Sequence, residues 1–328
     1  MIPNTFGISA TADRYLVVRD ESELRSLLSD TSCAAQPPLI VGSGSNMVFT
    51  RHYPGTIIHL ENKGICLECE DGGDLLVTAA AGEVWDDFVH YCIRQGWHGA
   101  ENLVAIPGTV GAAPVQNVGA YGSEAKDIVD SVLAYELSTG ASRRFSREEC
   151  QFGYRHSIFK GALKNRYLVW SVTFRLHKDF VPNLQYKALS SALQKADVAN
   201  PDAQQLADLI ADIRWSKLPR PEEIGSAGSF FKNPIVPVEQ YLRLLAEYPG
   251  LVAYPADEGY KLAAGWLIEQ AGWKGRNLGR CGVYEKQALV LVNRGGCTGA
   301  DVVALADAVT AAVRSRFGVT LEKEAIIV

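Results

Sequence analysis

Hydrophobic and polar residues alternate in the first half of the chain in the manner of half-buried β-strands. The alternation is clear in ICLECED (65–71) and RYLVWSVTFRL (166–176), and LLVTAAAG (75–82) and IVDSVLAYEL (128–137) are also predicted strands. Apolar residues in EVWDDFVHYCIRQG (83–96) instead recur at helical spacing and end at a glycine. This half of the chain therefore predicts a mixed α and β core.

Helical patterns dominate the second half. A polar helix is predicted from Asp202 to Ile213, and further helices near 237–247, within KLAAGWLIEQAG (261–272) and from Asp301 to Phe317. The proline cluster in RWSKLPRPEE marks a domain boundary, and the chain ends on a predicted strand, LEKEAIIV. We expect an α+β protein with segments 1–63, 64–213 and 214–319, and with a strand near 320–328 as a candidate to return to the first segment.

Composition and charge exclude several classes of protein. Of 328 residues, 47% are hydrophobic and 21% are charged, and the formal net charge is -5. Nucleic-acid-binding proteins cluster Lys and Arg against phosphates, so this balance disfavours them. The chain shows neither a signal-like start nor a run near the ~20 apolar residues of a membrane span. We expect a cytoplasmic monomer that binds neither membrane nor nucleic acid.

Cysteine and histidine usage predicts reduced thiols and no metal site. The seven cysteines, at 33, 66, 69, 92, 150, 281 and 297, are scattered and odd in number, unlike the framework of a small secreted domain. Cys66 and Cys69 form a CxxC within an alternating stretch, but no second Cys or His pair completes a zinc site. The six histidines are equally dispersed.

Two glycine-rich segments are candidates for binding a phosphate and a flat ring. VGSGSN (41–46) follows a predicted strand, where glycines let backbone N–H groups approach a phosphate, although an ordinary tight turn fits equally. It lacks the full GxGxxG and the following helix of a dinucleotide fold. PGTVGAAPVQNVGAYG (107–122) has no amphipathic period, so it is either a ligand surface or a structural Ω-type loop.

Three further segments carry candidate side chains. YRHSIFK is an anion clamp or solvated surface charge, and it contains Tyr154, Arg155, Ser157 and Lys160. GSAGSFFKNP places Ser229 after a flexible glycine and before two phenylalanines, which alone fits a solvent-facing loop. LEKE puts Glu322 and Glu324 on one strand face, either a solvated edge or a carboxylate directed into a pocket.

The order and spacing of these motifs resemble one family. Together with IRWSKLP, AAGWLIEQAGWKG and KQALVLVN, they are similar to those of the bacterial UDP-N-acetylenolpyruvoylglucosamine reductases, the MurB flavoproteins of peptidoglycan synthesis. The resemblance runs from about residue 10 to the C-terminus. PNLQYKAL (182–189) resembles the inserted tyrosine loop of the first subtype, whereas Tyr284 stands where many relatives carry His.

The resemblance implies a fold, a cofactor and a reaction. The fold is the FAD-binding fold of the vanillyl-alcohol-oxidase type, with two α+β subdomains that hold FAD noncovalently and a C-terminal α+β domain that closes over a sugar nucleotide. NADPH reduces the flavin and leaves, and UDP-N-acetylglucosamine enolpyruvate takes its place in the same pocket. The implied product is UDP-N-acetylmuramate, the activity classified as EC 1.3.1.98.

The family match also implies three catalytic residues. Hydride transfer to the terminal carbon of the enolpyruvyl group leaves negative charge on the neighbouring carbon and its carboxylate, and this charge needs cations and an acid. By the resemblance, Arg155 and a protonated Glu324 hold that charge, and Ser229 gives the proton. Gly228 would bring Ser229 close to the flavin, while Phe230 and Phe231 anchor the loop.

Binding residues are implied in the same way. For FAD, with backbone amides contributing most, the matching positions are Gly42, Ser43, Gly44, Ser45, Asn46, Pro107, Gly108, Gly111, Gln116, Asn117, Gly119, Ala120, Tyr121, Gly122 and Arg214. For the substrate, Lys217 supplies charge to the diphosphate and Tyr186 closes a lid. The full substrate set is Tyr154, Tyr186, Lys217, Asn233 and Gln287.

Two other functions fit parts of the same pattern. An oxidase or dehydrogenase on the same FAD scaffold could act on an alcohol or a sugar and pass electrons to oxygen, because fold does not fix function. A catalytically silent protein that binds a sugar nucleotide could also have kept the fold. A flavin that turns over rapidly with oxygen and does not respond to NADPH would favour the oxidase. Failure of the protein to hold any flavin would favour the silent binding protein.

Overall fold

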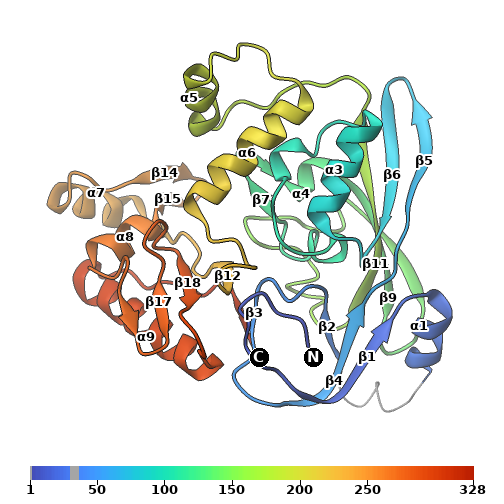
Figure 1. Cartoon of the computed structure of the whole chain (residues 1–328), viewed down its shortest axis with the longest axis horizontal. Coiled ribbons are helices and arrows are strands. Elements are labelled where there is room, and N and C mark those ends of the chain that lie inside the picture. Colours follow the sequence, from blue (N-terminus) through green and yellow to red (C-terminus); the bar gives the residue numbers. More distant parts are fainter. Residues whose placement is uncertain (1, 30–36) are drawn as a thin grey trace. The chain divides into compact units, whose positions relative to one another are not determined.

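The computed structural model describes residues 2–29 and 37–328, so Cys33 lies outside the described residues. The chain forms two compact units (Figure 1). Unit 1 contains Met1–Thr11, Gly44–Tyr53 and Trp215–Val328, and unit 2 contains Ala12–Ser43 and Pro54–Arg214. The finer division into segments 1–63, 64–213 and 214–319 stays a prediction.

A five-stranded antiparallel sheet forms the centre of unit 2, in the order β10-β9-β11-β6-β5. Its strands are β5 (Ile65–Asp71), β6 (Asp74–Ala80), β9 (Val129–Glu136), β10 (Ser142–Ser146) and β11 (Tyr167–His177). Helix α3 (Trp85–Gln95) packs on this sheet, since the Phe88 ring lies 4.7 Å from that of Phe174 in β11. Gly96, with φ of 70°, ends the helix as predicted.

A smaller sheet of unit 2 has the order β1-β4-β2, from β1 (Ala12–Val18), β2 (Leu39–Val41) and β4 (Tyr53–Leu60). Helix α1 (Glu21–Leu28) follows β1. Asp20 caps its start, because Asp20 Oδ1 accepts from the Glu23 amide at 2.8 Å, and Glu23 Oε2 accepts from the Arg19 amide at 2.7 Å. Leu24 and Ile58 are fully buried in the core that α1 shares with β4.

The segment after α3 contains only short elements. This agrees with the prediction from its sequence, which has no amphipathic period. They are η1 (Glu101–Leu103), η2 (Val110–Ala112), β7 (Gly119–Ala120), β8 (Ser123–Glu124) and α4 (Ala125–Ile128). Two helices lie beyond β11, α5 (Lys187–Lys195) and α6 (Ala203–Lys217). Helix α6 is the predicted polar helix, and α5 lies in the PNLQYKAL segment and beyond it, where no helix was predicted.

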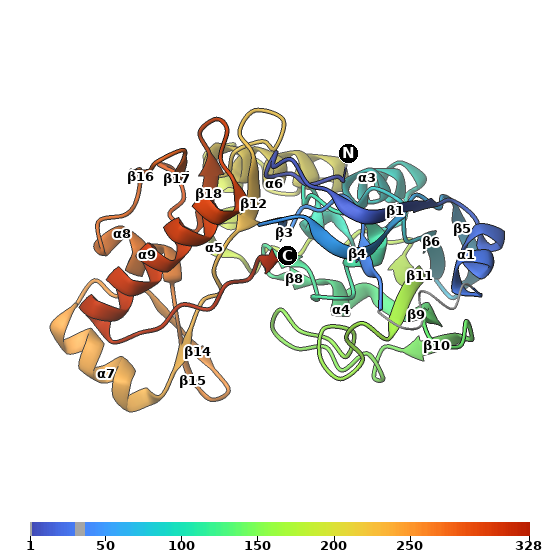
Figure 2. The same cartoon turned by 90° about the horizontal axis from the view of Figure 1, so that it is seen from below.

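Unit 1 contains two antiparallel sheets and three helices. The sheets are β12-β18-β17-β16 and β13-β15-β14, formed by β12 (Ser226–Ser229), β13 (Ile235–Val236), β14 (Ala253–Ala256), β15 (Gly259–Leu262), β16 (Asn277–Leu278), β17 (Cys281–Val283) and β18 (Val290–Asn293). The helices are α7 (Val238–Glu247), α8 (Ala264–Gln270) and α9 (Gly299–Phe317). Figure 2 shows α9 beside α8 and β17, and the three share one core. The predicted α+β class is confirmed.

The predicted strand at the end of the chain is much shorter than expected. Only β19 (Ile326–Ile327) forms, and it pairs in parallel with β3 (Met47–Val48) in unit 1. The Thr50 amide extends the contact by donating to the Val328 carbonyl at 2.7 Å. Within residues 2–29 and 37–328, none of the helices is long and apolar enough to cross a membrane.

The prediction that all the cysteines are reduced is wrong for two of them. Cys281 in β17 and Cys297, just before α9, form a disulfide with their Cα atoms 5.7 Å apart. Sequence spacing could not show this pairing, because the approach depends on how β17 packs against the start of α9. Cys66, Cys69, Cys92 and Cys150 are free, and among the described residues no group of three metal-binding side chains forms.

We expect this disulfide to stabilise unit 1. It closes a segment with a sequence separation of 16 residues, for which chain entropy predicts a contribution of roughly 3 kcal/mol to the free energy of unfolding. Changing Cys281→Ala and Cys297→Ala together should lower the urea midpoint. A reducing agent should lower the midpoint of the wild type but not of the double variant.

The control is Cys66→Ala with Cys69→Ala, because both of these thiols are free and exposed. This pair should leave the midpoint unchanged. A wild-type midpoint that is the same with and without a reducing agent would contradict the stabilising role.

Candidate active site

The first glycine-rich segment divides between the two units. Gly42 and Ser43 belong to unit 2, whereas Gly44, Ser45 and Asn46 belong to unit 1. In unit 1 the segment lies against the N-terminal residues, since a Cβ at Gly44 would meet the Pro3 carbonyl oxygen at 2.1 Å and Thr5 Oγ1 donates to the Ser45 carbonyl at 3.4 Å.

Unit 2 brings the two glycine-rich segments into contact. A Cβ at Gly42 would lie 2.3 Å from Oγ1 of Thr109, which belongs to the second segment. A Cβ at Gly111 would lie 2.6 Å from the Cβ of Ala81, so this glycine is needed for close packing on the main sheet. The buried Ser43 Oγ has no hydrogen-bond partner in the described part of the chain. A buried hydroxyl beside closely packed glycine backbone fits a phosphate-bearing cofactor.

The second glycine-rich segment is shaped by residues with left-handed backbone. Gly108 and Gly122 have φ of 140° and 84°, and two residues with side chains, Asn117 and Tyr121, both have φ of 48°. Asn117 is fully buried, and its amide nitrogen donates to Glu124 Oε2 at 2.9 Å and to the Gly153 carbonyl at 3.0 Å. The Asn117 side chain therefore makes its hydrogen bonds within the protein. This agrees with the expectation that backbone amides of the loop contribute most of the FAD binding.

The turn that carries Arg155 is fastened to this loop. Arg155 has φ of 51°, and its guanidinium donates to the Asn117 carbonyl at 3.4 Å and to the Gly119 carbonyl at 2.9 Å. Ser157 is buried and donates to the Val115 carbonyl at 2.6 Å, and Lys160 Nζ donates to the Arg155 carbonyl at 3.3 Å. Ser157 and Lys160 thus stabilise the turn. The Tyr154 ring centre lies 5.6 Å from the Arg155 guanidinium carbon.

A second cation and two aromatic rings lie near the same loop. Burial lowers the pKa of Arg214, an effect that Tyr121 and Asp86 oppose and to which the positive charge of Arg155 adds. Burial raises the pKa of the Tyr121 hydroxyl, which the charge of Arg214 partly offsets. The Tyr186 ring packs edge-on against Tyr121 at 5.4 Å. This side of unit 2 is suited to an anionic ligand with an aromatic part.

Two residues that support the loop were missed in the sequence. Asp86 Oδ1 accepts from the amide of Ala105, whose φ is 59°, at 2.5 Å. Asn102, only 4% exposed, donates to the carbonyls of Tyr121 and Asn183, both at 2.9 Å. Asp86 resembled an ordinary acidic residue in the first turn of a helix, whereas the polar Asn102 inside an apolar stretch was a usable signal.

In unit 1 the chain brings Ser229 and Glu324 onto neighbouring backbone segments. Gly228 has φ of 65°, and Ser229 follows it at the end of β12, opposite Val290 of β18. Phe230 is fully buried in the core and Phe231 nearly so, which confirms the expected anchor. The Glu324 amide donates to the Phe230 carbonyl at 2.8 Å, so Glu324 lies beside the residue that follows Ser229.

Asn46 is attached to the same C-terminal segment. Its Nδ2 donates to the Glu324 carbonyl at 3.2 Å, and its own carbonyl accepts from the Ile326 amide at 2.9 Å. The end of the glycine-rich segment therefore fixes the backbone on both sides of Ala325. Asn46 was predicted only as a flavin ligand, and this supporting role was not foreseen.

Two predicted substrate residues meet at the start of α8. Asn233 Oδ1 accepts from the Ala264 amide at 2.9 Å, and Gln287 Oε1 would lie 3.0 Å from a Cβ placed on Gly265. Lys217 is exposed at the end of α6. Tyr284, the noted departure from the family pattern, is buried and packs with Val290 and Val292.

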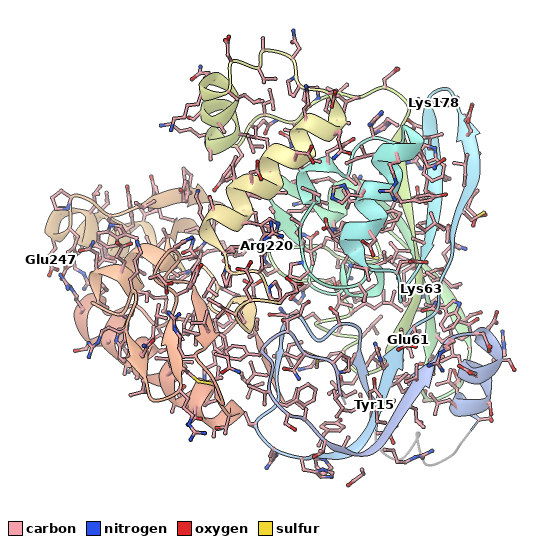
Figure 3. All side chains as sticks on the ribbon, viewed as in Figure 1. Tyr15, Glu61, Lys63, Lys178, Arg220 and Glu247 are labelled. Atoms are coloured by element: carbon pink, nitrogen blue, oxygen red, sulfur yellow. A yellow bond between two sulfur atoms is a disulfide. The ribbon has the colours of Figure 1, made fainter. Side chains whose placement is uncertain are left out.

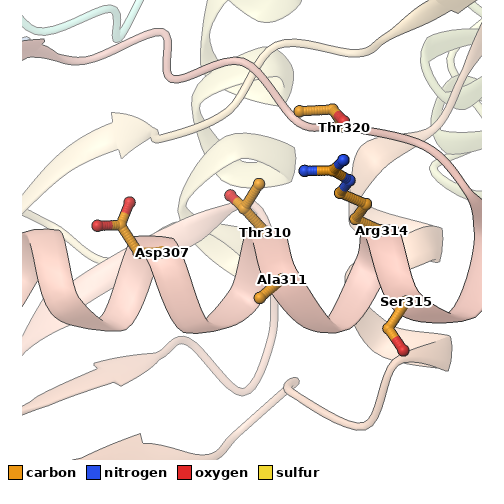
Figure 4. A pocket seen from close by; sticks show the side chains of 6 residues that line it. All are labelled: Asp307, Thr310, Ala311, Arg314, Ser315 and Thr320. Atoms are coloured by element: carbon orange, nitrogen blue, oxygen red, sulfur yellow. The ribbon is translucent and has the colours of Figure 1, made fainter.

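The structure thus assembles the predicted residues in two groups. Unit 2 gathers Gly42, Ser43, Pro107, Gly108, Gly111, Gln116, Asn117, Gly119, Ala120, Tyr121, Gly122, Tyr154, Arg155, Tyr186 and Arg214, and unit 1 holds Gly44, Ser45, Asn46, Lys217, Ser229, Asn233, Gln287 and Glu324. Figure 3 labels Lys63 and Lys178, which form ion pairs with Glu83 and Glu70. The open pocket along α9, between Asp307 and Thr320, contains none of the predicted residues (Figure 4).

Comparison with known proteins first gives the class. Residues 12–144 match the family model described as the FAD binding domain. Two features of unit 2 fit that cofactor, namely the buried Ser43 hydroxyl and the close approach of Gly42 to Thr109. The protein is an FAD-binding oxidoreductase.

The remaining comparisons give the family. Residues 220–328 match the family model of the UDP-N-acetylenolpyruvoylglucosamine reductase C-terminal domain. The enzyme of that name from Azoarcus sp. (strain BH72) is 49% identical over 99% of this chain and 95% of its own length, and that from Bdellovibrio bacteriovorus is 47% identical over 98% and 96%. The protein belongs to the UDP-N-acetylenolpyruvoylglucosamine reductase family.

A solved structure agrees with the fold. The crystal structure of UDP-N-acetylenolpyruvylglucosamine reductase (MurB) from Thermus caldophilus has a TM-score of 0.69 and covers 99% of this chain and 95% of that chain, at 24% sequence identity. The expected FAD-binding fold with a C-terminal α+β domain is confirmed.

We expect Gly42→Ala to weaken FAD binding by about tenfold, because overpacking typically costs 1–3 kcal/mol. The added methyl group would displace Thr109 and move the two glycine-rich segments apart. Titration of apoprotein with FAD, followed by quenching of flavin fluorescence, measures the effect.

Two further variants sharpen this test. Adding Thr109→Ala to Gly42→Ala should recover part of the lost affinity, because it removes the atoms that clash. Gly250→Ala is the control, since a Cβ there meets nothing within 4 Å. Equal FAD affinity in Gly42→Ala and Gly250→Ala would show that this contact does not shape the flavin site.

Proposed function

We propose that the protein reduces UDP-N-acetylglucosamine enolpyruvate to UDP-N-acetylmuramate, with NADPH as the source of hydride and Ser229 as the proton donor. The observation that supports it best is the placement of Glu324, whose amide binds the Phe230 carbonyl next to Ser229. FAD, when bound, accepts hydride from NADPH and delivers it to the terminal carbon of the enolpyruvyl double bond. The two substrates bind in turn.

Arg155 and Glu324 stabilise the charge that the reaction creates. When the terminal carbon receives hydride, the electron pair of the double bond moves to the neighbouring carbon and is shared with its carboxylate. The guanidinium of Arg155 offsets this charge, and Glu324 in its acid form donates a hydrogen bond to the same group. Arg214 adds a second positive charge near the glycine-rich loop.

Ser229 completes the addition by giving its hydroxyl proton to the carbon that carries the charge. A hydroxyl is a weak acid, but the carbon is strongly basic, so placement of the oxygen limits the step. The rigid anchor of Phe230 and Phe231 and the left-handed Gly228 supply that placement. Solvent then returns a proton to the serine oxygen.

The remaining polar groups bind the sugar nucleotide. Asn233 and Gln287, whose side chains reach the start of α8, contact the diphosphate or the sugar. Lys217 supplies positive charge. Tyr154 lies beside the substrate carboxylate, and Tyr186 closes over the bound ligand from the segment before α5. The cytoplasmic location and the monomeric state stay predictions.

Ser229→Ala should leave reduction of the flavin by NADPH intact and slow its reoxidation by the enolpyruvyl sugar by at least about 10³-fold, because only the proton donor is removed. Stopped-flow absorbance at the visible flavin band separates the two half-reactions.

The matched control is Ser226→Ala, on the same strand, which should keep both half-reactions. Reoxidation of Ser229→Ala at the wild-type rate would exclude this residue as the acid. Rapid turnover with oxygen that does not respond to NADPH would instead favour an oxidase.

Glu324→Gln and Glu324→Ala test whether the acid form of Glu324 is the active one. An amide preserves a neutral hydrogen-bond donor, so Glu324→Gln should retain more activity than Glu324→Ala. The kcat values of the two variants measure this difference. If Glu324→Gln is as inactive as Glu324→Ala, a charged carboxylate is required and the proposed role is wrong.

A further inference from the structure

The Arg155 turn is joined to the glycine-rich loop by hydrogen bonds that run in both directions. From the turn, Arg155 donates to the carbonyls of Asn117 and Gly119, and Ser157 donates to that of Val115. From the loop, Asn117 Nδ2 returns a bond to the Gly153 carbonyl at 3.0 Å. Only the last of these bonds is donated by a loop side chain.

Asn117 connects three parts of unit 2 through one amide. Besides Gly153, its Nδ2 donates to Glu124 Oε2 at 2.9 Å, and its Oδ1 accepts from the Lys126 amide at 2.9 Å, in the first turn of α4. Its side chain is fully buried and its φ of 48° lies in the left-handed region that Asn tolerates better than most residues. An aliphatic side chain or a carboxylate of the same size could not satisfy all three partners.

We propose that Asn117 is a positioning residue for Arg155, which acts through the Gly153 carbonyl and not by holding the flavin itself. This inference rests on the proposed role of Arg155 toward the substrate carboxylate. One residue, Tyr154, separates Gly153 from Arg155, and both lie in the turn that the backbone bridge of Gly153 with His156 closes. Movement of Gly153 therefore changes where the guanidinium lies relative to the carbonyls it binds.

The contacts of Asn117 can be separated by a compensating pair of substitutions. Asn117→Asp alone removes both amide donors and sets a buried carboxylate against that of Glu124, so it should destabilise the loop as a whole. Adding Glu124→Gln restores a hydrogen bond between positions 117 and 124 with the direction reversed, and it keeps an acceptor for the Lys126 amide. The Gly153 carbonyl then loses the bond from Asn117 and keeps the bond from the His156 amide at 3.1 Å.

The double variant Asn117→Asp/Glu124→Gln should bind FAD and be reduced by NADPH within about twofold of the wild type. Its reoxidation by UDP-N-acetylglucosamine enolpyruvate should be slower by about tenfold, the scale of one buried hydrogen bond. Binding of that sugar nucleotide to the oxidised protein, followed by the flavin difference spectrum, should weaken in parallel. Glu124→Gln alone is the matched control and should behave as wild type.

A second comparison distinguishes positioning from general support of the fold. In an Arg155→Ala background, the double substitution should slow reoxidation no further, because the group that it positions is gone. An additional tenfold loss in that background, equal slowing of both half-reactions, or unchanged reoxidation in the double variant would each overturn the role of Asn117. A wild-type protein whose reduced flavin the sugar nucleotide does not reoxidise would overturn the proposed function, and this inference with it.

Discussion

The glycine-rich loop buries backbone polar groups that neither a helix nor a sheet satisfies, and the rest of unit 2 is arranged around that constraint. Buried carbonyls and amides need partners, and here many are side chains from distant segments. Asn102 binds the Tyr121 carbonyl and Ser157 binds the Val115 carbonyl, while Asp86 binds the Ala105 amide just before the loop. The Gly119 carbonyl is held by Arg155, so a residue proposed for catalysis is also part of the support.

This arrangement links cofactor binding with placement of the substrate carboxylate. The loop that the family match assigns to FAD also accepts two hydrogen bonds from the Arg155 guanidinium, through the carbonyls of Asn117 and Gly119. A bound flavin that makes the loop more rigid would therefore also restrict the position of the Arg155 guanidinium. Preorganised charge of this kind is an effective source of transition-state stabilisation, because it costs no reorganisation during the reaction.

Unit 1 positions its groups in another way. Ser229 lies at the end of a strand and is fixed by the buried phenylalanines that follow it, while Glu324 is held by backbone bonds to Phe230 and Asn46. The C-terminal segment is also joined to this core by the bridge of Lys323 with Phe231, and its strand is limited to Ile326–Ile327. The disulfide between Cys281 and Cys297 fixes β17 to the segment before α9 in the same core.

Much of the fold could be predicted from local pattern. The alternation in β5 and β11, the helical face of α3 and the glycine after α3 all correspond to elements of the structure. The candidate site residues were found through motif order, because Ser229 or Arg155 alone resembled ordinary surface residues.

Contacts between distant segments could not be predicted, because spacing along the chain does not reveal them. The disulfide, the bond from Asp86 to Ala105 and the engagement of Asn117 with Gly153 are all of this kind. Each contact depends on how elements pack. Each also joins residues that, considered alone, could equally be ordinary surface or core residues. Helix α5 was missed because its segment was interpreted only as an inserted loop.

The most direct test of the account is an anaerobic absorbance trace at the visible flavin band of the wild-type protein loaded with FAD. NADPH is added first, and UDP-N-acetylglucosamine enolpyruvate follows. The account predicts bleaching by NADPH and full recovery of the band on addition of the sugar nucleotide. Bleaching without recovery would contradict the proposed substrate, and a flavin that NADPH does not bleach would contradict the proposed reductant.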